Sequence, residues 1–207
     1  MSRLAEGAEA VVTAEDILGV RAVRKHRFVK GYRDPALDQR LRGERLRTEV
    51  RLLREARRAG IRTPIVLDVE LEGSSLLLEW LDGPTLSEVL TSSAPRDATR
   101  ARCVERWGQA LGKLHAAGVA HGDLTASNVL WCDGDVAFLD LSLGSRSPGI
   151  EELGIDLHLV REDLNTLCPD REELYERFLT GYRSAFPTGC AAVEARAKEI
   201  QGRVRYS

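Results

Sequence analysis

Residues 121–144 read HGDLTASNVLWCDGDVAFLDLSLG, and this stretch determines how the whole chain is interpreted. Two apolar runs, VLWC over 129–132 and VAFL over 136–139, flank an Asp-Gly-Asp turn sequence. Apolar, strand-forming residues on both sides of an Asp-Gly turn are typical of a β-hairpin. The pattern therefore predicts two short antiparallel strands joined by a turn at residues 133–135.

Three oxygen-bearing side chains lie at the ends of these expected strands. Asp123 and Asn128 precede the first strand, and Asp140 directly follows the second. A hairpin would hold all three near its open end, where their oxygens suit a hard cation such as Mg²⁺ and the phosphates that it binds. A hairpin with acidic ends and no ligand explains the same pattern, so the rest of the chain has to decide between the two.

Composition defines the broad class of protein. The chain has 207 residues, of which 43% are hydrophobic and 30% charged, as in a globular protein with one domain or two small lobes. No apolar run approaches about 18 residues and the N-terminus is not apolar, so we expect a cytoplasmic protein without a membrane span or signal peptide. Its four cysteines are widely spaced, which favours free thiols over a metal site.

The small net charge of −2 hides a strong asymmetry. Residues 1–62 contain 16 Lys and Arg against 9 Asp and Glu, a net charge of +7, while the remainder carries −9. A basic first third favours contact with polyanions such as nucleotide phosphates or RNA. A solvated, arginine-rich helix face explains the same residues equally well, and the sequence leaves both alternatives open.

The periodicity of apolar residues changes along the chain. Strand patterns dominate up to residue 81, and helical patterns dominate beyond the breaker sequence Asp82-Gly83-Pro84. The expected strands cover residues 19–26, 65–71 and 76–81, and residues 4–12 are expected to form two strands joined by a turn at Gly7. The expected helices cover residues 37–59, 85–90, 97–117, 151–164, 170–186 and 190–200. We therefore predict an α+β fold with a strand-rich lobe over 1–81 that holds one main helix, and a helical lobe over 82–207.

Two charged residues of the first lobe complete a chemical pattern. Lys25 lies near the end of an expected strand, and Glu49 lies in the next helix beside its apolar face. With Asp123, Asn128 and Asp140 they form, in this order, the set of side chains that phosphoryl transfer from ATP requires. A lone lysine or glutamate says little, but HGDLTASN followed by Leu-Asp after a hairpin is specific in both spacing and context.

Several stretches carry a family resemblance. They are GAEA (7–10), KHRFVKGYRDPALDQRLRGERLRTE (25–49), RRAGIRTP (57–64), HGDLTASN (121–128) and the basic C-terminal end. Over nearly its whole length the chain resembles the small atypical serine/threonine kinases of the KEOPS complex, the Bud/PRPK family. The block over 25–49 is the most discriminating, because general protein kinases and antibiotic phosphotransferases lack it.

The resemblance implies a minimal bilobal protein-kinase-like fold that binds ATP and Mg²⁺. It implies that Lys25 contacts phosphate with Glu49 as its helix partner, that Asp123 is the catalytic aspartate, and that Asn128 and Asp140 hold the metal. The implied nucleotide contacts are the turn residues Gly7, Ala8, Glu9 and Ala10, the gatekeeper Leu78, and the backbone of Glu79 and Leu81.

Some positions depart from the usual kinase pattern. Leu141 and Ser142 follow Asp140 where most kinases have Phe and Gly, and Thr125 stands where many serine/threonine kinases have lysine. Asp34 replaces a histidine found in many relatives. No APE-like signature follows Asp140, so we expect no activation loop controlled by phosphorylation.

The family implies an ATP-dependent serine/threonine kinase or ATPase subunit that supports the biosynthesis of threonylcarbamoyladenosine on tRNA. The implied partners are the threonylcarbamoyl transferase subunit, a small regulatory subunit and tRNA, with no membrane. The basic first third of the chain, together with Arg203 and Arg205 near its end, fits contact with tRNA or with the transferase.

Other functions fit part of the pattern. A small-molecule phosphotransferase of the aminoglycoside type shares HGDL, the asparagine and a later aspartate, but needs an acidic acceptor pocket for which the stretch after Asp140 leaves little room. A free-standing protein kinase and a non-catalytic scaffold are further alternatives. Intact Lys25, Asp123, Asn128 and Asp140 argue against the scaffold.

Overall fold

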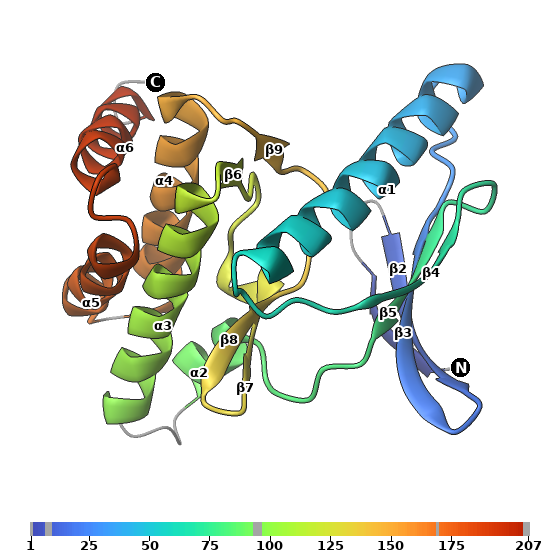
Figure 1. The fold of residues 1–207 in the computed structure, drawn as a ribbon, viewed down its shortest axis with the longest axis horizontal. Coiled ribbons are helices and arrows are strands. Elements are labelled where there is room, and N and C mark those ends of the chain that lie inside the picture. The colour runs from blue at the N-terminus through green and yellow to red at the C-terminus, as the bar shows by residue number, and fades with distance from the viewer. Residues whose placement is uncertain (1, 7–9, 93–96, 169, 205–207) are drawn as a thin grey trace.

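An antiparallel sheet forms the N-terminal part of the protein (Figure 1). The structure, a computed structural model, describes residues 2–6, 10–92, 97–168 and 170–204. The strand order of the sheet is β1-β2-β3-β5-β4. Its strands are β1 (Ser2–Glu6), β2 (Ala10–Ile17), β3 (Val20–Arg27), β4 (Val66–Glu70) and β5 (Ser75–Glu79). The strands expected in this region are all present, with their ends shifted by a few residues.

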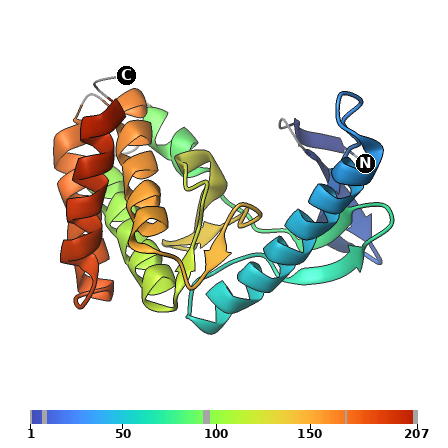
Figure 2. The same ribbon diagram turned by 90° about the horizontal axis from the view of Figure 1, so that it is seen from above.

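One long helix, α1 (Pro35–Arg58), runs along this sheet (Figure 2). It begins two residues earlier than predicted because the Asp34 carboxylate accepts hydrogen bonds from the N–H groups of Ala36 and Leu37, both at 3.0 Å. Asp34 is thus the N-cap of α1. On the apolar face of α1, Leu46 and Leu53 are fully buried, whereas Val50 is only partly buried.

The chain beyond β5 is mainly helical. Its helices are α2 (Leu86–Thr91), α3 (Asp97–Ala116), the 3-10 turn η1 (Ala126–Asn128), α4 (Ile150–Leu167), α5 (Arg171–Ala185) and α6 (Cys190–Val204). Its short strands are β6 (Val119–Ala120), β7 (Val129–Cys132), β8 (Asp135–Phe138) and β9 (Ser145–Arg146). An antiparallel sheet followed by helices confirms the α+β class. None of the helices within the described ranges is long and apolar enough to span a membrane.

The predicted hairpin is formed by β7 and β8, which pair from Val129 with Phe138 to Cys132 with Asp135. The connection from the sheet is fixed to this hairpin, since the Trp131 N–H donates to the Pro84 carbonyl at 2.8 Å. A Cβ atom on Gly83 would lie only 2.2 Å from the Trp131 carbonyl oxygen, so glycine is required there. The breaker sequence therefore docks on the hairpin.

The two parts of the molecule share one hydrophobic core. The same cluster of buried side chains includes Leu53 of α1, Leu78 of β5, Phe138 of β8 and Trp107 of α3. Trp107 is fully buried and meets the ring of Phe178 edge-on at 5.5 Å. This continuity fixes the sheet and α1 against the hairpin, and thereby places the side chains that lie between them.

Helices α3 and α5 approach each other through two glycines. A Cβ atom on Gly108 would lie 2.0 Å from the Phe178 carbonyl oxygen, and one on Gly181 would lie 2.0 Å from the Glu105 carbonyl oxygen. Both clashes are with helix backbone, which cannot move aside without separating the helices. The sequence analysis did not single out either glycine.

Gly108→Ala is expected to lower the free energy of unfolding by about 1–3 kcal/mol, because overpacking outweighs the gain in helix propensity. Gly202→Ala in α6 is the matched control, since no atom lies within 4 Å of its added Cβ and alanine favours the helix. Urea denaturation followed by circular dichroism measures both. Equal stability of the two variants would show that α3 and α5 are not in close contact.

Candidate active site

A cleft of about 470 Å³ lies between the sheet and the β7–β8 hairpin. Val12 and Val23 contribute apolar surface from the sheet, and Leu130 does so from the hairpin. Lys25 and Asp140 add charged groups to the same cleft. Its volume and its mixture of apolar walls and a few polar groups are typical of a site for a small molecule.

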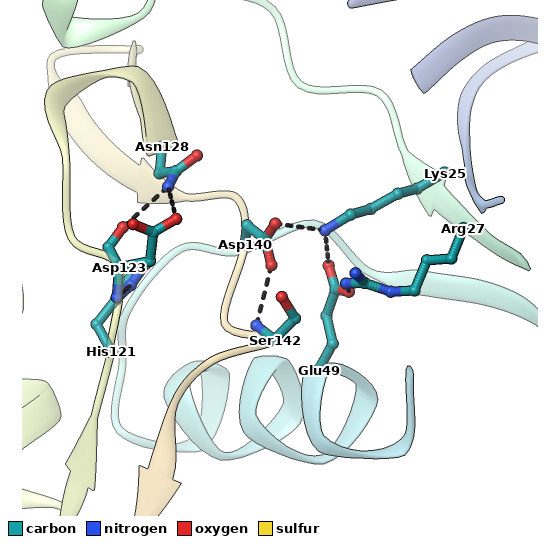
Figure 3. Close-up of polar contacts among 8 residues, drawn as sticks. All are labelled: Lys25, Arg27, Glu49, His121, Asp123, Asn128, Asp140 and Ser142. Atoms are coloured by element: carbon teal, nitrogen blue, oxygen red, sulfur yellow. Dashed lines mark hydrogen bonds and ion pairs between the residues drawn. The ribbon is translucent and has the colours of Figure 1, made fainter. Parts of the chain in front are cut away.

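Lys25 lies at the centre of an ion network (Figure 3). Its Nζ is 2.6 Å from Glu49 Oε1 and 2.6 Å from Asp140 Oδ2. Lys25 comes from β3, Glu49 from α1, and Asp140 from the segment after β8, so three elements far apart in sequence meet at one ammonium group. The pairing of Lys25 with Glu49 that the sequence suggested is present, and it holds the ammonium at the wall of the cleft.

A second cation, Arg27, holds the other oxygen of Glu49. Its Nη2 is 2.7 Å from Glu49 Oε2, and Arg27 and Glu49 are only 4% and 0% exposed. Alternate residues of a strand point to the same face, so Lys25 and Arg27 both reach α1 from β3. The sequence analysis missed Arg27, although two cations at alternate positions before a helical acid could have indicated it.

The carboxylate of Asp140 is held in its ionised form. Burial opposes ionisation, but the Lys25 ammonium and the Ser142 N–H, which is 2.9 Å from Oδ1, keep the pKa of Asp140 well below its usual range. Leu141 between them is fully buried. The unusual residues after Asp140 therefore anchor this segment and contribute a hydrogen bond to its carboxylate.

Asp123 and Asn128 lie side by side at the start of the hairpin. Asn128 Nδ2 donates to the main-chain oxygen of Asp123 at 2.9 Å and to its Oδ2 at 3.2 Å. These contacts direct the amide nitrogen toward Asp123 and leave the amide oxygen of Asn128 pointing away from it (Figure 3). Asn128 also lines the cleft.

A buried carboxylate on α4 holds the loop that carries Asp123. Asp156 is 0% exposed and accepts hydrogen bonds from the N–H groups of His121 at 2.7 Å and Gly122 at 2.8 Å. It also contacts His115 Nε2 at 3.1 Å, and His115 Nδ1 contacts the Tyr182 hydroxyl at 2.8 Å. Asp156 could not be identified from the sequence, since nothing around it distinguishes it from the other acids of α4.

The ring of His121 is completely buried against Phe138, with the two ring centroids 5.4 Å apart. Burial lowers the pKa of His121, so the imidazole is neutral at physiological pH. An uncharged, packed ring supports the loop geometry and does not compete with Asp123 for the substrate.

The remaining predicted nucleotide contacts fall into three groups. Leu78, Glu79 and Leu81 line the cleft. Ala10 begins β2 and is buried, and it is not part of the described cleft lining. Gly7, Ala8 and Glu9 lie outside the described residues.

The donor atoms at the cleft fit Mg²⁺. The Asn128 amide oxygen and the Asp140 carboxylate are hard oxygen ligands, and Mg²⁺ is usually held by one or two such groups together with substrate phosphates. The described ranges contain no group of three or more His, Cys, Asp and Glu side chains placed to share a metal. An ion bound here would therefore take its other ligands from phosphates and water.

The antiparallel sheet, the single helix and the lysine–carboxylate network define a kinase-like protein, and sequence comparison agrees. The profile of the lipopolysaccharide kinase (Kdo/WaaP) family matches residues 6–151, well over half of the chain. The chain belongs to this family, and a kinase family implies phosphoryl transfer and the use of ATP.

Curated proteins named probable bifunctional tRNA threonylcarbamoyladenosine biosynthesis protein are similar to this chain. The one from Methanoculleus marisnigri is 40% identical over 203 residues, which cover 98% of this chain and 36% of that protein. Those from Methanothermobacter thermautotrophicus and Methanospirillum hungatei are 36% and 39% identical over 99% and 98% of this chain, again 36% of each protein. The chain thus spans little more than one third of their length. The resemblance noted in the sequence is confirmed.

Proposed function

We propose that the chain is an ATP-dependent serine/threonine kinase or ATPase whose active site is the cleft between a lobe over residues 1–81 and a lobe over 82–207. The observation that carries the proposal is the contact of Lys25 Nζ with both Glu49 and Asp140 at 2.6 Å. The three groups come from separate elements and meet at a cleft, which a purely structural ion pair does not require.

The N-terminal lobe binds the nucleotide. Lys25 neutralises the α- and β-phosphates, and Glu49 holds its ammonium in position. Leu78 limits the depth of the pocket, and the backbone at Glu79 and Leu81 meets the adenine edge. The resemblance assigns further nucleotide contacts to Gly7, Ala8, Glu9 and Ala10, of which the first three lie outside the described residues.

The C-terminal lobe supplies the transfer machinery. Asp123 accepts the proton of the acceptor hydroxyl or orients it, and the Asn128 amide keeps the Asp123 carboxylate in place. Asn128 and Asp140 would hold Mg²⁺, which would neutralise charge on the phosphate oxygens. Asp156 positions the loop before Asp123 through two backbone N–H groups.

The biological role that we propose is support of threonylcarbamoyladenosine biosynthesis on tRNA, as a cytoplasmic subunit of a KEOPS-type complex. Its partners would be the threonylcarbamoyl transferase subunit, a small regulatory subunit and tRNA. The names of the relatives support this role, and their greater length is consistent with a second activity carried on the same chain.

A second candidate is a phosphotransferase acting on a small hydroxylated molecule, which the description of the matching family as lipopolysaccharide kinases favours. Transfer of labelled phosphate from ATP to sugars or aminoglycosides, compared with transfer to serine in proteins, separates the two functions.

ATP hydrolysis by the chain is expected to rise when the transferase subunit and tRNA are both added, because the proposed complex couples turnover to its substrate. Phosphate release is measured with each component alone and together, and Asp123→Ala protein in the same mixtures gives the background. A rate that responds to neither component, together with transfer to a small acceptor, would replace the proposed function with the second candidate.

A further inference from the structure

Four arginines form a row along one face of α1. Arg47, Arg51, Arg54 and Arg58 are spaced by four, three and four residues, and all four are exposed. At about 100° per residue these positions lie within a sector of roughly 60°, and at 1.5 Å per residue the row is about 16 Å long. They form a straight, narrow strip of positive charge, which we call the arginine row.

The arginine row has no ion-pair partner within the part of the chain that the structure describes. Among the described residues no carboxylate lies within ion-pair distance of any of the four guanidinium groups. Elsewhere on α1, Arg42 is 2.7 Å from Asp38 and Arg57 is 2.5 Å from the Thr63 carbonyl. Like charges three and four residues apart destabilise a helix, so the row lowers the stability of α1 unless an external anion binds to it.

A groove of about 370 Å³ follows the row between α1 and β4. The four arginines line it together with Val69 and Leu71, which are 37% and 52% exposed. Glu55 also lines the groove, but its carboxylate is paired with Arg146 at 3.0 Å. No aromatic side chain is among the described lining residues, whereas protein interfaces usually depend on buried aromatic anchors. No described residue lines both this groove and the active-site cleft.

We propose that the arginine row is an RNA-binding site that contacts successive phosphates of the sugar–phosphate backbone. Guanidinium groups bind phosphate oxygens through two parallel N–H donors, and a straight row of them matches a polyanionic strand better than a compact acidic patch on a protein. The RNA is tRNA if the proposed function holds, so the identity of the ligand rests on that proposal, while the site rests on the row.

The test compares two variants of equal charge. In the row variant Arg47, Arg51, Arg54 and Arg58 are all replaced by alanine. The control variant replaces four exposed cations on the C-terminal helices by alanine, namely Arg102, Lys113, Arg177 and Lys198. Binding of a labelled tRNA transcript to the full chain is measured at several salt concentrations.

The row variant is expected to bind the transcript at least about tenfold more weakly near physiological salt. Its plot of log affinity against log salt should be flatter by about 3, since each lost phosphate contact removes roughly 0.7–0.9 from the slope. The control variant should bind like the parent. A variant with Arg51→Glu and Arg58→Glu provides a second measurement, with the same expected direction, if the fourfold variant folds poorly.

Several outcomes would overturn the inference. They are parental affinity in the row variant, an equal loss in the control variant, and displacement of the transcript by polyglutamate as effectively as by RNA of equal charge, which would indicate an acidic protein partner. ATP hydrolysis without RNA is measured in parallel and should not change in the row variant. A parent protein that binds RNA through the row but hydrolyses no ATP would refute the proposed function and leave the RNA site standing.

Discussion

Replacing Asp123 or Asp140 by alanine lowers ATP turnover by at least about 10²-fold, the scale on which one strong transition-state group acts. The Asp123 variant loses the group that we propose accepts the proton of the acceptor hydroxyl or orients it. The Asp140 variant loses a carboxylate that burial would neutralise, but that Lys25 and the Ser142 N–H keep ionised. The two losses affect different steps of one reaction, so both variants should have a low kcat.

Asp135→Ala is the matched control for this pair. Asp135 lies in the same hairpin, but it is exposed, and within the described ranges its carboxylate accepts a hydrogen bond only from the neighbouring Val136 N–H at 2.9 Å. The Asp135→Ala variant should turn over ATP at the rate of the parent protein. Steady-state hydrolysis with saturating Mg²⁺ measures all three, and thermal melts confirm folding. Parental turnover in the Asp123 variant would remove the catalytic assignment.

Local signals explain which parts of the fold the sequence could predict. The β7–β8 hairpin follows from an Asp-Gly turn between strand-forming residues, and α1 follows from its apolar periodicity. The cap at Asp34, which starts α1 two residues before the predicted position, was not recognised in the sequence. The two-residue strands β6 and β9 were not predicted, because their pairing of Val119 with Arg146 depends on the folded chain and not on periodicity.

The same distinction applies to the site. Lys25, Glu49 and Asp140 could be proposed from their order along the chain. In the structure the Lys25 ammonium lies 2.6 Å from both carboxylates. Asp156 could not be proposed in this way, because its role is defined by hydrogen-bond partners on other elements. A buried charge reveals its role only when its counter-charge or hydrogen-bond donors are known.

Glu49→Ala is expected to lower the free energy of unfolding by about 3–5 kcal/mol, because it removes the carboxylate that contacts both Lys25 and Arg27 in the buried network. Glu49 is 0% exposed, so water cannot replace its two oxygens. Glu44→Ala on the same helix is the control. The Glu44 side chain is 59% exposed and 3.8 Å from Arg40, and its loss should change stability by less than about 0.5 kcal/mol.

A double variant separates the structural role of Glu49 from its catalytic role. Arg27→Met with Glu49→Leu removes one positive and one negative charge, fills the space with apolar side chains, and leaves Lys25 paired with Asp140. Stability should recover most of the loss seen in Glu49→Ala, since apolar replacement of a buried ion pair is often neutral. ATP turnover should remain low, because Lys25 no longer has the carboxylate that holds it toward α1.

Recovery of turnover together with stability would show that Glu49 only compensates charge. No recovery of stability would show that Arg27 is not its principal partner, and a urea-denaturation cycle over the single and double variants measures that coupling directly.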